Sequence, residues 1–485
     1  MDNIRLSEVL RAVSRACDVA SARPYGFAQR VARVSMRLSA QAPLGDELRG
    51  DLLVASLCHS AGMAAVSGDV ARVVFGDERP SLRLYPVDAV TSRLALGSPL
   101  DVDGEARTGV FVRHHMPICR FPLMTAQWLH HIGLMRVAML VAPMLDLAEQ
   151  QRLPRPEAVA SGMLTLAYHM VAVRWLAASA SGVERQHIEH ARTLIADGRW
   201  IEELAGVSFN PDLIELAQEQ WADGQFWSEM DAVRTDAWIR PDTQSGHNTR
   251  AEAPDVNVDE LLGSYTFSAN ELGEDVPDVD AAINALLAPR TGEQLPLHSP
   301  VLEGWLGFLG MMVDHKAVFA PGHAARVVNM TREVALLLEA DDVEVLRLTL
   351  GAWVYGVGKL ALPSALLEQS GGLNDVQRAM VRETPRLTVS TMAPLRALLP
   401  SIDEVAAYAE RMDGSGYPKG LRSDDIPLPG RLLAVVDTYE ALIADRPYRL
   451  AYSNARALHI VQAQSGRLFD GVITDLLEGI TRGEL

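Results

Sequence analysis

A loop near the C-terminus of this 485-residue chain gathers the polar side chains best suited to chemistry. Residues 410–421 read ERMDGSGYPKGL, and three glycines and a proline in so short a span exclude a helix or strand interior. The loop holds two carboxylates that could recruit a cation, together with a phenol and an amine, on Glu410, Asp413, Tyr417 and Lys419. Its Asp-Gly and Tyr-Pro pairs predict two turns.

Helices must hold this loop in place. One predicted helix runs into Glu410, and a second starts within 426–431 and carries Asp437. Residues suited to capping a helix N-terminus recur through the second half of the chain, at Asn374, Ser401, Ser453 and Asp470. Together with the helical spacing of apolar residues elsewhere, these signals predict an all-α protein.

The loop, Asp437 and the turn Asp445-Arg446-Pro447-Tyr448 resemble the HD-GYP family of phosphohydrolases. The resemblance covers about 302–478, and its loop signature is highly specific. It implies an all-helical domain in which His and carboxylate side chains hold two or three divalent ions. In that family the ions activate a water for the hydrolysis of cyclic di-GMP. Divalent iron or manganese would suit such ligands.

Only part of that ligand set is present. His323, in a Gly-His-x-x-Arg-Val context, and Asp437 stand at positions where the family has ligands. The other ligand positions carry side chains that hold metals poorly or not at all: Tyr355, Gly356, Thr384, Tyr408 and Ala409. The resemblance therefore implies a catalytically degenerate domain with no cofactor, in which the two tyrosines fill the vacated metal cavity.

Each retained residue also has a structural interpretation. His323 is equally well explained by a core or capping role, and Asp437 by a bond to backbone or to Arg431. Lys359, in the family's Gly-Lys context, is the candidate contact for a nucleotide phosphate, against a solvated lysine at a helix end. Arg446 is a second nucleotide candidate, or a brace for its own turn. The resemblance also implies a surface for a protein partner, formed by Glu410, Asp413, Gly416, Tyr417 and Pro418.

The first half of the chain resembles the second, which predicts two HD-like domains in tandem. Four landmarks recur 296 residues later: Gly26, Arg30, Val31 and Gly62 match Gly322, Arg326, Val327 and Gly358. Phe209-Asn-Pro then matches Phe469-Asp-Gly at an offset of 260. From this change of offset we predict that the first copy lost a segment, the one that would have held the glycine-rich loop. His59-Ser60 falls where Tyr355-Gly356 falls in the second copy.

The remaining histidines of the first half do not predict a metal site. They occur as two adjacent pairs and as one pair at helical spacing: His114-His115, His130-His131, and His187 with His190. No carboxylate or cysteine completes a recognisable ligand set around them. We expect surface or packing roles, and no catalysis in this half.

Composition limits the cellular setting and the partners. The net charge of −18 argues against a nucleic-acid partner, because that affinity depends on positive charge that displaces counterions. Three cysteines without a Cys-x-x-Cys pair, Cys17, Cys58 and Cys119, indicate a reducing compartment. No signal peptide or membrane span is expected, so a cytoplasmic protein is predicted. The domains are predicted at 1–240 and 281–485, joined by an acidic linker at 241–280.

The leading hypothesis is a protein that acts in cyclic di-GMP signalling by binding. It would bind the nucleotide or a partner such as a diguanylate cyclase of the GGDEF type, and a homodimer is expected. The first alternative is an active phosphodiesterase with an unusual ligand set from His323, Glu410, Asp413 and Asp437. The second alternative is a scaffold that binds no nucleotide.

Overall fold

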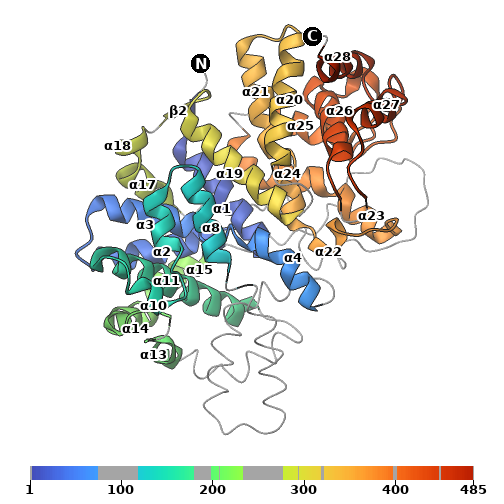
Figure 1. Cartoon of the computed structure of the whole chain (residues 1–485). Helices are drawn as coiled ribbons and strands as arrows, with labels where there is room; N and C mark the ends of the chain where they lie inside the picture. The colour runs from blue at the N-terminus through green and yellow to red at the C-terminus, as the bar shows by residue number, and fades with distance from the viewer. Residues whose placement is uncertain are drawn as a thin grey trace, which may run out of the picture. The chain divides into compact units, whose positions relative to one another are not determined.

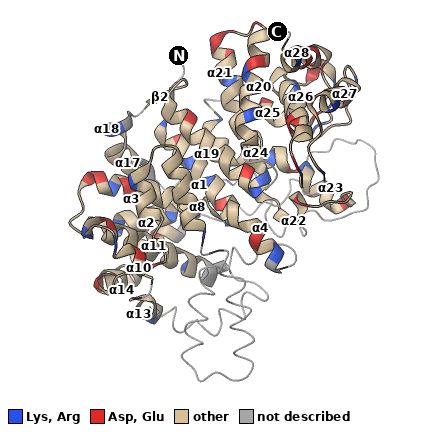
Figure 2. Cartoon of the chain, in the orientation of Figure 1, with Lys and Arg blue, Asp and Glu red and all other residues tan. Residues whose placement is uncertain are grey.

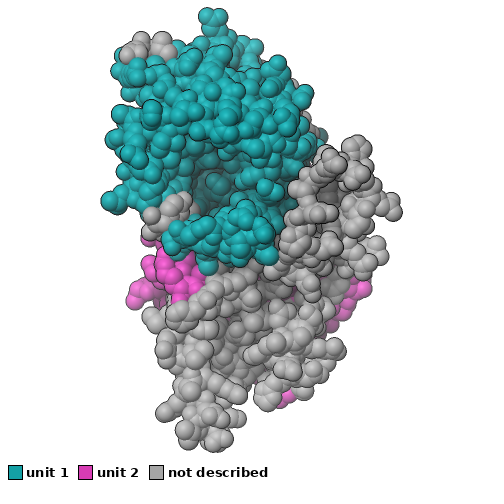
Figure 3. All heavy atoms as spheres, turned by 90° about the vertical axis from the view of Figure 1, so that its right-hand side faces the viewer, with its two compact units in different colours: residues 1–12, 236–272, 294–485 teal, residues 13–235, 273–293 magenta. Residues whose placement is uncertain are grey.

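The computed structural model divides the chain into two compact units (Figure 3). The N-terminal unit comprises 13–235 and 273–293, and the C-terminal unit comprises 1–12, 236–272 and 294–485. The structure describes residues 3–23, 25–74, 118, 120–179, 198–206, 208–232, 277–292, 294–317, 322–396, 401–446 and 449–483. The predicted linker lies almost entirely outside these residues and stays a prediction.

Helices build the N-terminal unit (Figure 1). They are the last part of α1 (Leu6–Ala20), α2 (Phe27–Ala40), α3 (Asp46–Cys58), α4 (Met63–Val74), α8 (Phe121–His131), α9 (Met135–Val141), α10 (Leu147–Gln150), α11 (Arg155–Ser179), α13 (Arg199–Leu204), η1 (Pro211–Leu213), α14 (Ile214–Ala222), α15 (Gly224–Ala232), α17 (Pro277–Leu286) and α18 (Ala288–Thr291). The central helix is α11, which packs on α2, α3 and α9. Residues 160–173 of α11 are all buried, which explains why this helix is apolar on every side.

An ion-pair cluster ties α18 and α9 to α3. The carboxylate of Asp51 on α3 lies 3.3 Å from Nη1 of Arg290 and 2.8 Å from Nη2 of Arg136. Burial raises the pKa of Asp51, and the two guanidinium groups act in the opposite direction. The cluster explains why residues 273–293 belong to the N-terminal unit although they lie far along the chain.

The C-terminal unit is a helical domain with one small strand pair. Strands β1 (Asn3–Arg5) and β2 (Gln294–Pro296) pair antiparallel, with Ile4 opposite Leu295. The helices are α19 (Pro300–Lys316), α20 (His323–Leu337), α21 (Asp342–Val354), η2 (Val357–Ala361), α22 (Ser364–Leu367), α23 (Asp375–Arg382), α24 (Thr384–Thr391), η3 (Ala393–Leu395), α25 (Ser401–Val405), η4 (Ala406–Ala409), η5 (Ser423–Asp425), α26 (Leu428–Ile443), α27 (Asn454–Gln462) and α28 (Gly471–Arg482). The prediction of an all-α fold is confirmed.

One hydrophobic cluster forms the core of the C-terminal unit. It takes its buried side chains from α20, α21, η4, α26, α27 and α28. Residues 432–436 of α26 are buried without exception, so this helix is surrounded by others. Tyr355, Tyr408 and Tyr439 belong to the same cluster. The helix that carries Asp437 is therefore one of the best-held elements of the unit.

Three of the four predicted helix caps are confirmed. Asn374 and Gln377 form the reciprocal capping box of α23, with both hydrogen bonds at 2.9 Å. Ser453 caps α27 and Asp470 caps α28 through side-chain oxygens that accept backbone N–H bonds. Ser401 is instead the first residue of α25.

The two halves share the same local construction, as the repeat predicts. Gly26 and Gly322 both adopt left-handed backbone conformations, with φ of +85° and +80°, immediately before α2 and α20. Gly62 and Gly358 each donate a backbone N–H to a threonine Oγ1, that of Thr125 in one half. A methyl group on either of these two glycines would lie 2.1 Å from a backbone oxygen, so both positions require glycine.

The predicted loss of a segment from the first copy is wrong. Gly62 lies 63 residues before Thr125, whereas Gly358 lies only 30 residues before Thr388, the partner of its own N–H. The first copy is therefore the longer one between these landmarks. An offset that falls along the chain, here from 296 to 260, means extra residues in the first copy.

One apolar stretch of the described residues is long enough to cross a membrane. It is Asp46–Arg72, and 89% of its most apolar window is buried inside the protein, which is typical of a core helix. Lys, Arg, Asp and Glu are distributed along the helices of both units (Figure 2).

Candidate functional site

The start of α20 places His323. Gly322 turns the chain in the left-handed conformation, and His323 is the first helical residue. Asp314 on α19 then fixes the helix start, because both of its carboxylate oxygens accept the backbone N–H of Ala324, at 3.1 and 3.2 Å. A carboxylate at the N-terminus of a helix also interacts favourably with the helix dipole. No sequence motif pointed to Asp314, which lies ten residues from the group that it caps.

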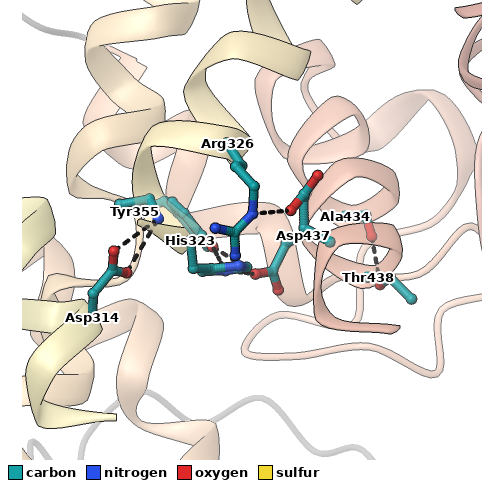
Figure 4. A network of polar contacts seen from close by, with 9 residues as sticks. Asp314, His323, Arg326, Tyr355, Ala434, Asp437 and Thr438 are labelled. Carbon is teal, nitrogen blue, oxygen red and sulfur yellow. Dashed lines mark hydrogen bonds and ion pairs between the residues drawn. The ribbon is translucent and has the colours of Figure 1, made fainter. Parts of the chain in front are cut away.

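Two side chains from distant parts of the chain, those of Tyr355 and His323, meet at the carboxylate of Asp437 (Figure 4). The Tyr355 hydroxyl donates to Asp437 Oδ1 at 2.5 Å. His323 Nε2 lies 3.1 Å from the same oxygen and 3.1 Å from the Tyr355 hydroxyl. Since a carboxylate can only accept, the tautomer of His323 with a proton on Nε2 makes this contact favourable. We call these three residues the Asp437 cluster.

The charge of Asp437 is strongly favoured in this cluster. Burial opposes ionisation, but the nearby ammonium of Lys359 and the hydrogen bonds from His323 and Tyr355 outweigh it, so the pKa of Asp437 lies well below its ordinary value. Burial and the adjacent Asp437 charge raise the pKa of Tyr355. Tyr355 is therefore a neutral phenol, a hydrogen-bond donor to a fixed carboxylate.

Lys359 belongs to η2, and its side chain lies beside Gly356, the residue immediately before η2. A Cβ added to Gly356 would stand 3.8 Å from both Cδ and Nζ of Lys359, and 3.3 Å from Val313. The ammonium lies 5.4 Å from the centre of the Tyr355 ring, within the range of a cation–π interaction. The lysine stem thus extends past the residue that has no side chain, toward the ring whose hydroxyl binds Asp437.

The other residues at changed positions are packed against this cluster or close to it. The rings of Tyr355 and Tyr408 meet edge to face, with centroids 5.0 Å apart. Both rings and Ala409 are buried members of the core cluster. Thr384 opens α24 and is also buried, with its carbonyl facing Gly358. Burial is the largest of the effects that raise the pKa of Tyr408.

The glycine-rich loop is built around Glu410. Its buried carboxylate accepts the backbone N–H of Lys419 at 2.7 Å and that of Leu421 at 3.0 Å, so one side chain closes the loop. Gly416 passes so close that a Cβ there would stand 2.4 Å from Cα of Glu410. The peptide bond from Tyr417 to Pro418 is cis.

The remaining loop residues differ in how far they are exposed. Tyr417 packs against the core cluster, and its N–H donates to Ala409 O at 3.2 Å. Asp413 is on the surface, where its carboxylate accepts the N–H of Ser415 at 3.0 Å. These hydrogen bonds lower the pKa of Asp413. Pro418 is exposed.

Comparison with known proteins identifies this unit. The HD domain family matches residues 308–473. The 3′3′-cGAMP-specific phosphodiesterase 3 of Vibrio cholerae is 30% identical over 183 residues, which are 38% of this chain and 40% of that protein. The cyclic di-GMP phosphodiesterase response regulator RpfG of Xanthomonas campestris is 33% identical over 174 residues, 36% of this chain and 46% of that protein. The chain thus covers less than half of the length of either relative.

This part of the chain is an HD domain of the HD-GYP family. The fold of the whole chain also has a counterpart: a crystal structure of a cyclic GMP-AMP-specific phosphodiesterase from V. cholerae superposes over 99% of this chain and 98% of its own, with a TM-score of 0.53 and 19% identity. That likeness concerns the fold, and it extends through both halves.

The Asp437 cluster of this HD-GYP domain does not fit a divalent ion. It offers one imidazole nitrogen and one carboxylate, and Oδ1 of that carboxylate already accepts the phenol hydrogen bond. The ammonium group of Lys359 lies nearby and would repel a divalent metal ion. Within the part of the chain that the structure describes, no three His, Cys, Asp or Glu side chains gather in a group. Divalent ions in such sites need several converging oxygen or nitrogen donors.

The unusual ligand set of the active-enzyme alternative is not brought together in the described residues. Glu410 and Asp413 do not join His323 and Asp437 in a group. The carboxylate of Glu410 is occupied by backbone N–H groups of its own loop, and Asp413 faces Ser415 and Arg467.

One further expectation about a partner is wrong, and some residues were missed. Asp437 does not bond to Arg431, which instead pairs with Asp470 at 2.7 Å. Arg446 and Arg449 exchange backbone hydrogen bonds at 2.7 and 3.0 Å, and the guanidinium of Arg449 donates to the carbonyls of Leu442, Ala441 and Leu450. The role of Arg446 as a brace or a nucleotide contact stays a prediction. Arg326, found only as a repeat landmark, forms an ion pair with the buried Glu440 at 2.9 Å (Figure 4).

The equivalent place in the N-terminal unit is filled by aromatic side chains. His59 is fully buried, with its Nδ1 2.8 Å from Ser56 O and its ring 5.0 Å from that of Tyr168. Burial lowers the pKa of His59 to about 3, so it is neutral. His130 and His131 are exposed, and His114, His115, His187 and His190 lie outside the described residues, as does Cys119.

Proposed function

We propose that the chain is a catalytically degenerate HD-GYP protein that acts in cyclic dinucleotide signalling by binding. The observation that carries the proposal is a contrast within one domain. The loop around Glu410 and Gly416 is fully built, whereas the position beside Asp437 carries a phenol and an ammonium instead of metal ligands. A domain that keeps its recognition loop while its donor set excludes the metal is suited to binding without turnover.

Lys359 is the proposed contact for a phosphate of the ligand. Its ammonium has three donors, its side chain is only partly buried, and it lies beside Gly356. The relatives are a 3′3′-cGAMP-specific and a cyclic di-GMP phosphodiesterase, which makes these two nucleotides the natural probes. Arg446, partly exposed after the end of α26, is proposed as a secondary contact.

The test is a calorimetric titration of the full chain with cyclic di-GMP and, separately, with 3′3′-cGAMP, in buffer that contains manganese. Saturable heat without linearised product supports a receptor. Lys359→Ala should then weaken binding about 10- to 100-fold, the effect of losing one charge-assisted contact. Lys419→Ala is the matched control, because Lys419 is an exposed lysine of the same unit. Linearised product would overturn the proposal in favour of an active phosphodiesterase.

Absence of heat with both nucleotides would favour the scaffold alternative. In that case the partner surface is the loop, and substitutions at Tyr417 or Pro418 should abolish capture of a diguanylate cyclase while Lys359→Ala should not. A GGDEF-type partner and a homodimer stay predictions, for which co-purification with a candidate cyclase and sedimentation analysis are the direct measurements.

A further inference from the structure

The positive charge of Lys359 lies close to the Asp437 cluster, where it compensates the negative charge of the Asp437 carboxylate. Asp437 is a mostly buried carboxylate, and a buried charge is costly unless an opposite charge and hydrogen bonds compensate it. His323 and Tyr355 supply the hydrogen bonds at Oδ1. The Lys359 ammonium lies 5.4 Å from the centre of the Tyr355 ring, whose hydroxyl binds Asp437, and its positive charge favours the ionised forms of Asp437 and Asp314. The positive charge of the site therefore comes from the chain itself.

Gly356 leaves room for the lysine beside it. The glycine adopts an ordinary right-handed conformation, with φ of −91°, so its backbone does not require a glycine. A Cβ there would be in van der Waals contact with Nζ and Cδ of Lys359, at 3.8 Å, and in tight contact with Val313, at 3.3 Å, so little room is left for further side-chain atoms. Any longer side chain, above all a carboxylate, would compete with Asp437 for the ammonium or displace the stem from the Tyr355 ring.

The N-terminal unit repeats part of this arrangement with different residues. Counting back by 296, His323 corresponds to Phe27, Tyr355 to His59, and Asp314 to Asp18. Asp18 accepts the N–H groups of Phe27 and Ala28, so it caps α2 just as Asp314 caps α20. Here too a side-chain cation lies against an aromatic ring: Arg23 is buried, with its guanidinium carbon 4.0 Å from the centre of the Phe27 ring.

The two cations come from different positions of the repeat. Arg23 precedes α2, whereas Lys359 follows α21, so they are not the same residue inherited twice. Arg23 also donates to the hydroxyl of Tyr168, at 3.3 Å, and lies over that ring. Two unrelated sequence positions have thus placed a cation on an aromatic ring beside a capping aspartate.

We propose that Lys359 is a fixed cation that takes over the electrostatic part of a metal ion at Asp437, and that the C-terminal unit reaches its full stability without metal. This inference rests on the proposed loss of the metal site, which it explains physically. Binding of a divalent ion would require the ammonium to leave, so the built site resists metal in addition to lacking ligands.

The test is a double-mutant cycle on the ligand-free full chain, read as thermal unfolding of the C-terminal unit. Lys359→Met keeps the length of the side chain and removes the charge, and should lower Tm by about 2–6 °C. Asp437→Asn removes the carboxylate charge. If the two charges compensate each other, the double variant loses clearly less than the sum of the two single losses. Lys419→Met, at an exposed lysine, should leave Tm unchanged.

A second measurement keeps the test independent of the variants. Wild-type protein should show the same Tm in EDTA and in millimolar manganese, and should bind no manganese in an equilibrium dialysis experiment. Additive losses in the cycle, or a manganese-dependent rise of the wild-type Tm, would overturn the inference. Neither readout involves a nucleotide, so a protein that ignores cyclic di-GMP but passes both tests would disprove the proposed function and leave the fixed cation standing.

Discussion

The hydroxyl of Tyr355 donates to Asp437 Oδ1 at 2.5 Å, although the two residues are 82 positions apart in the sequence. Tyr355 stands where the HD-GYP resemblance places a metal-binding histidine, and Asp437 where it places a metal-binding aspartate. The bond joins a changed position to a retained one. The retained aspartate is therefore a structural acceptor in this protein, and its presence alone does not indicate a metal.

Tyr355→Phe should destabilise the C-terminal unit by about 1.5–3 kcal/mol, because it removes a charge-assisted hydrogen bond and leaves Asp437 less compensated. Urea unfolding followed by tryptophan fluorescence measures the change. Tyr408→Phe is the control: its ring lies 5.0 Å from that of Tyr355 in the same core, and the described residues include no hydrogen-bond partner for its hydroxyl. Equal losses in the two variants would mean that the 2.5 Å bond contributes nothing.

The N-terminal unit should lose stability in acid because of His59. Its folded pKa of about 3 lies below the unfolded value near 6.5, so the unfolded state binds the proton first. The contribution of the buried neutral His59 to the free energy of unfolding is complete above pH 6.5. Between pH 6.5 and pH 3 the free energy of unfolding falls by about 1.4 kcal/mol for each unit by which the pH is lowered. His59→Asn should reduce this slope, measured as the midpoint of urea unfolding from pH 7 to pH 5. His130→Asn, at an exposed histidine, should keep the wild-type slope.

Gly416→Ala should distort the glycine-rich loop. The added methyl group would stand 2.4 Å from Cα of Glu410, so either the loop or the Glu410 carboxylate must move and lose its two backbone bonds. We expect a loss of about 1–3 kcal/mol and faster cleavage of 411–421 by a protease. Gly371→Ala is the control, since nothing lies within 4 Å of a Cβ there. An unchanged cleavage rate in Gly416→Ala would contradict this account of the loop.

Restoring the family's pair should create a metal site. The combined substitution Tyr355→His and Gly356→Asp places two more ligands beside His323 and Asp437, which already converge. Manganese should then stabilise the variant, by about 2.7 kcal/mol at 100 times its Kd, while the wild-type Tm stays constant. The reverse pattern, with stabilisation of the wild type alone, would show that the native site holds metal after all.

The fold and the family were within reach of the sequence because their signals are local. Helix caps such as Asn374 with Gln377, and the glycine spacing of the loop at 410–421, depend on residues a few positions apart. The repeat is visible in the sequence because some of its landmarks have a backbone conformation that favours glycine, such as the left-handed Gly26 and Gly322. Wherever a short-range backbone requirement selects the residue type, the sequence itself carries the information.

Only the tertiary structure decided what the site residues do. The sequence placed Asp437 on a helix but not its bond to Tyr355, and it named Glu410 as a possible ligand although both of its oxygens serve the loop. Asp314 and Arg449 carried no signal at all. The physical reason is that a side chain's role depends on which groups meet it in space, and in a helical domain those groups come from helices far apart in the chain.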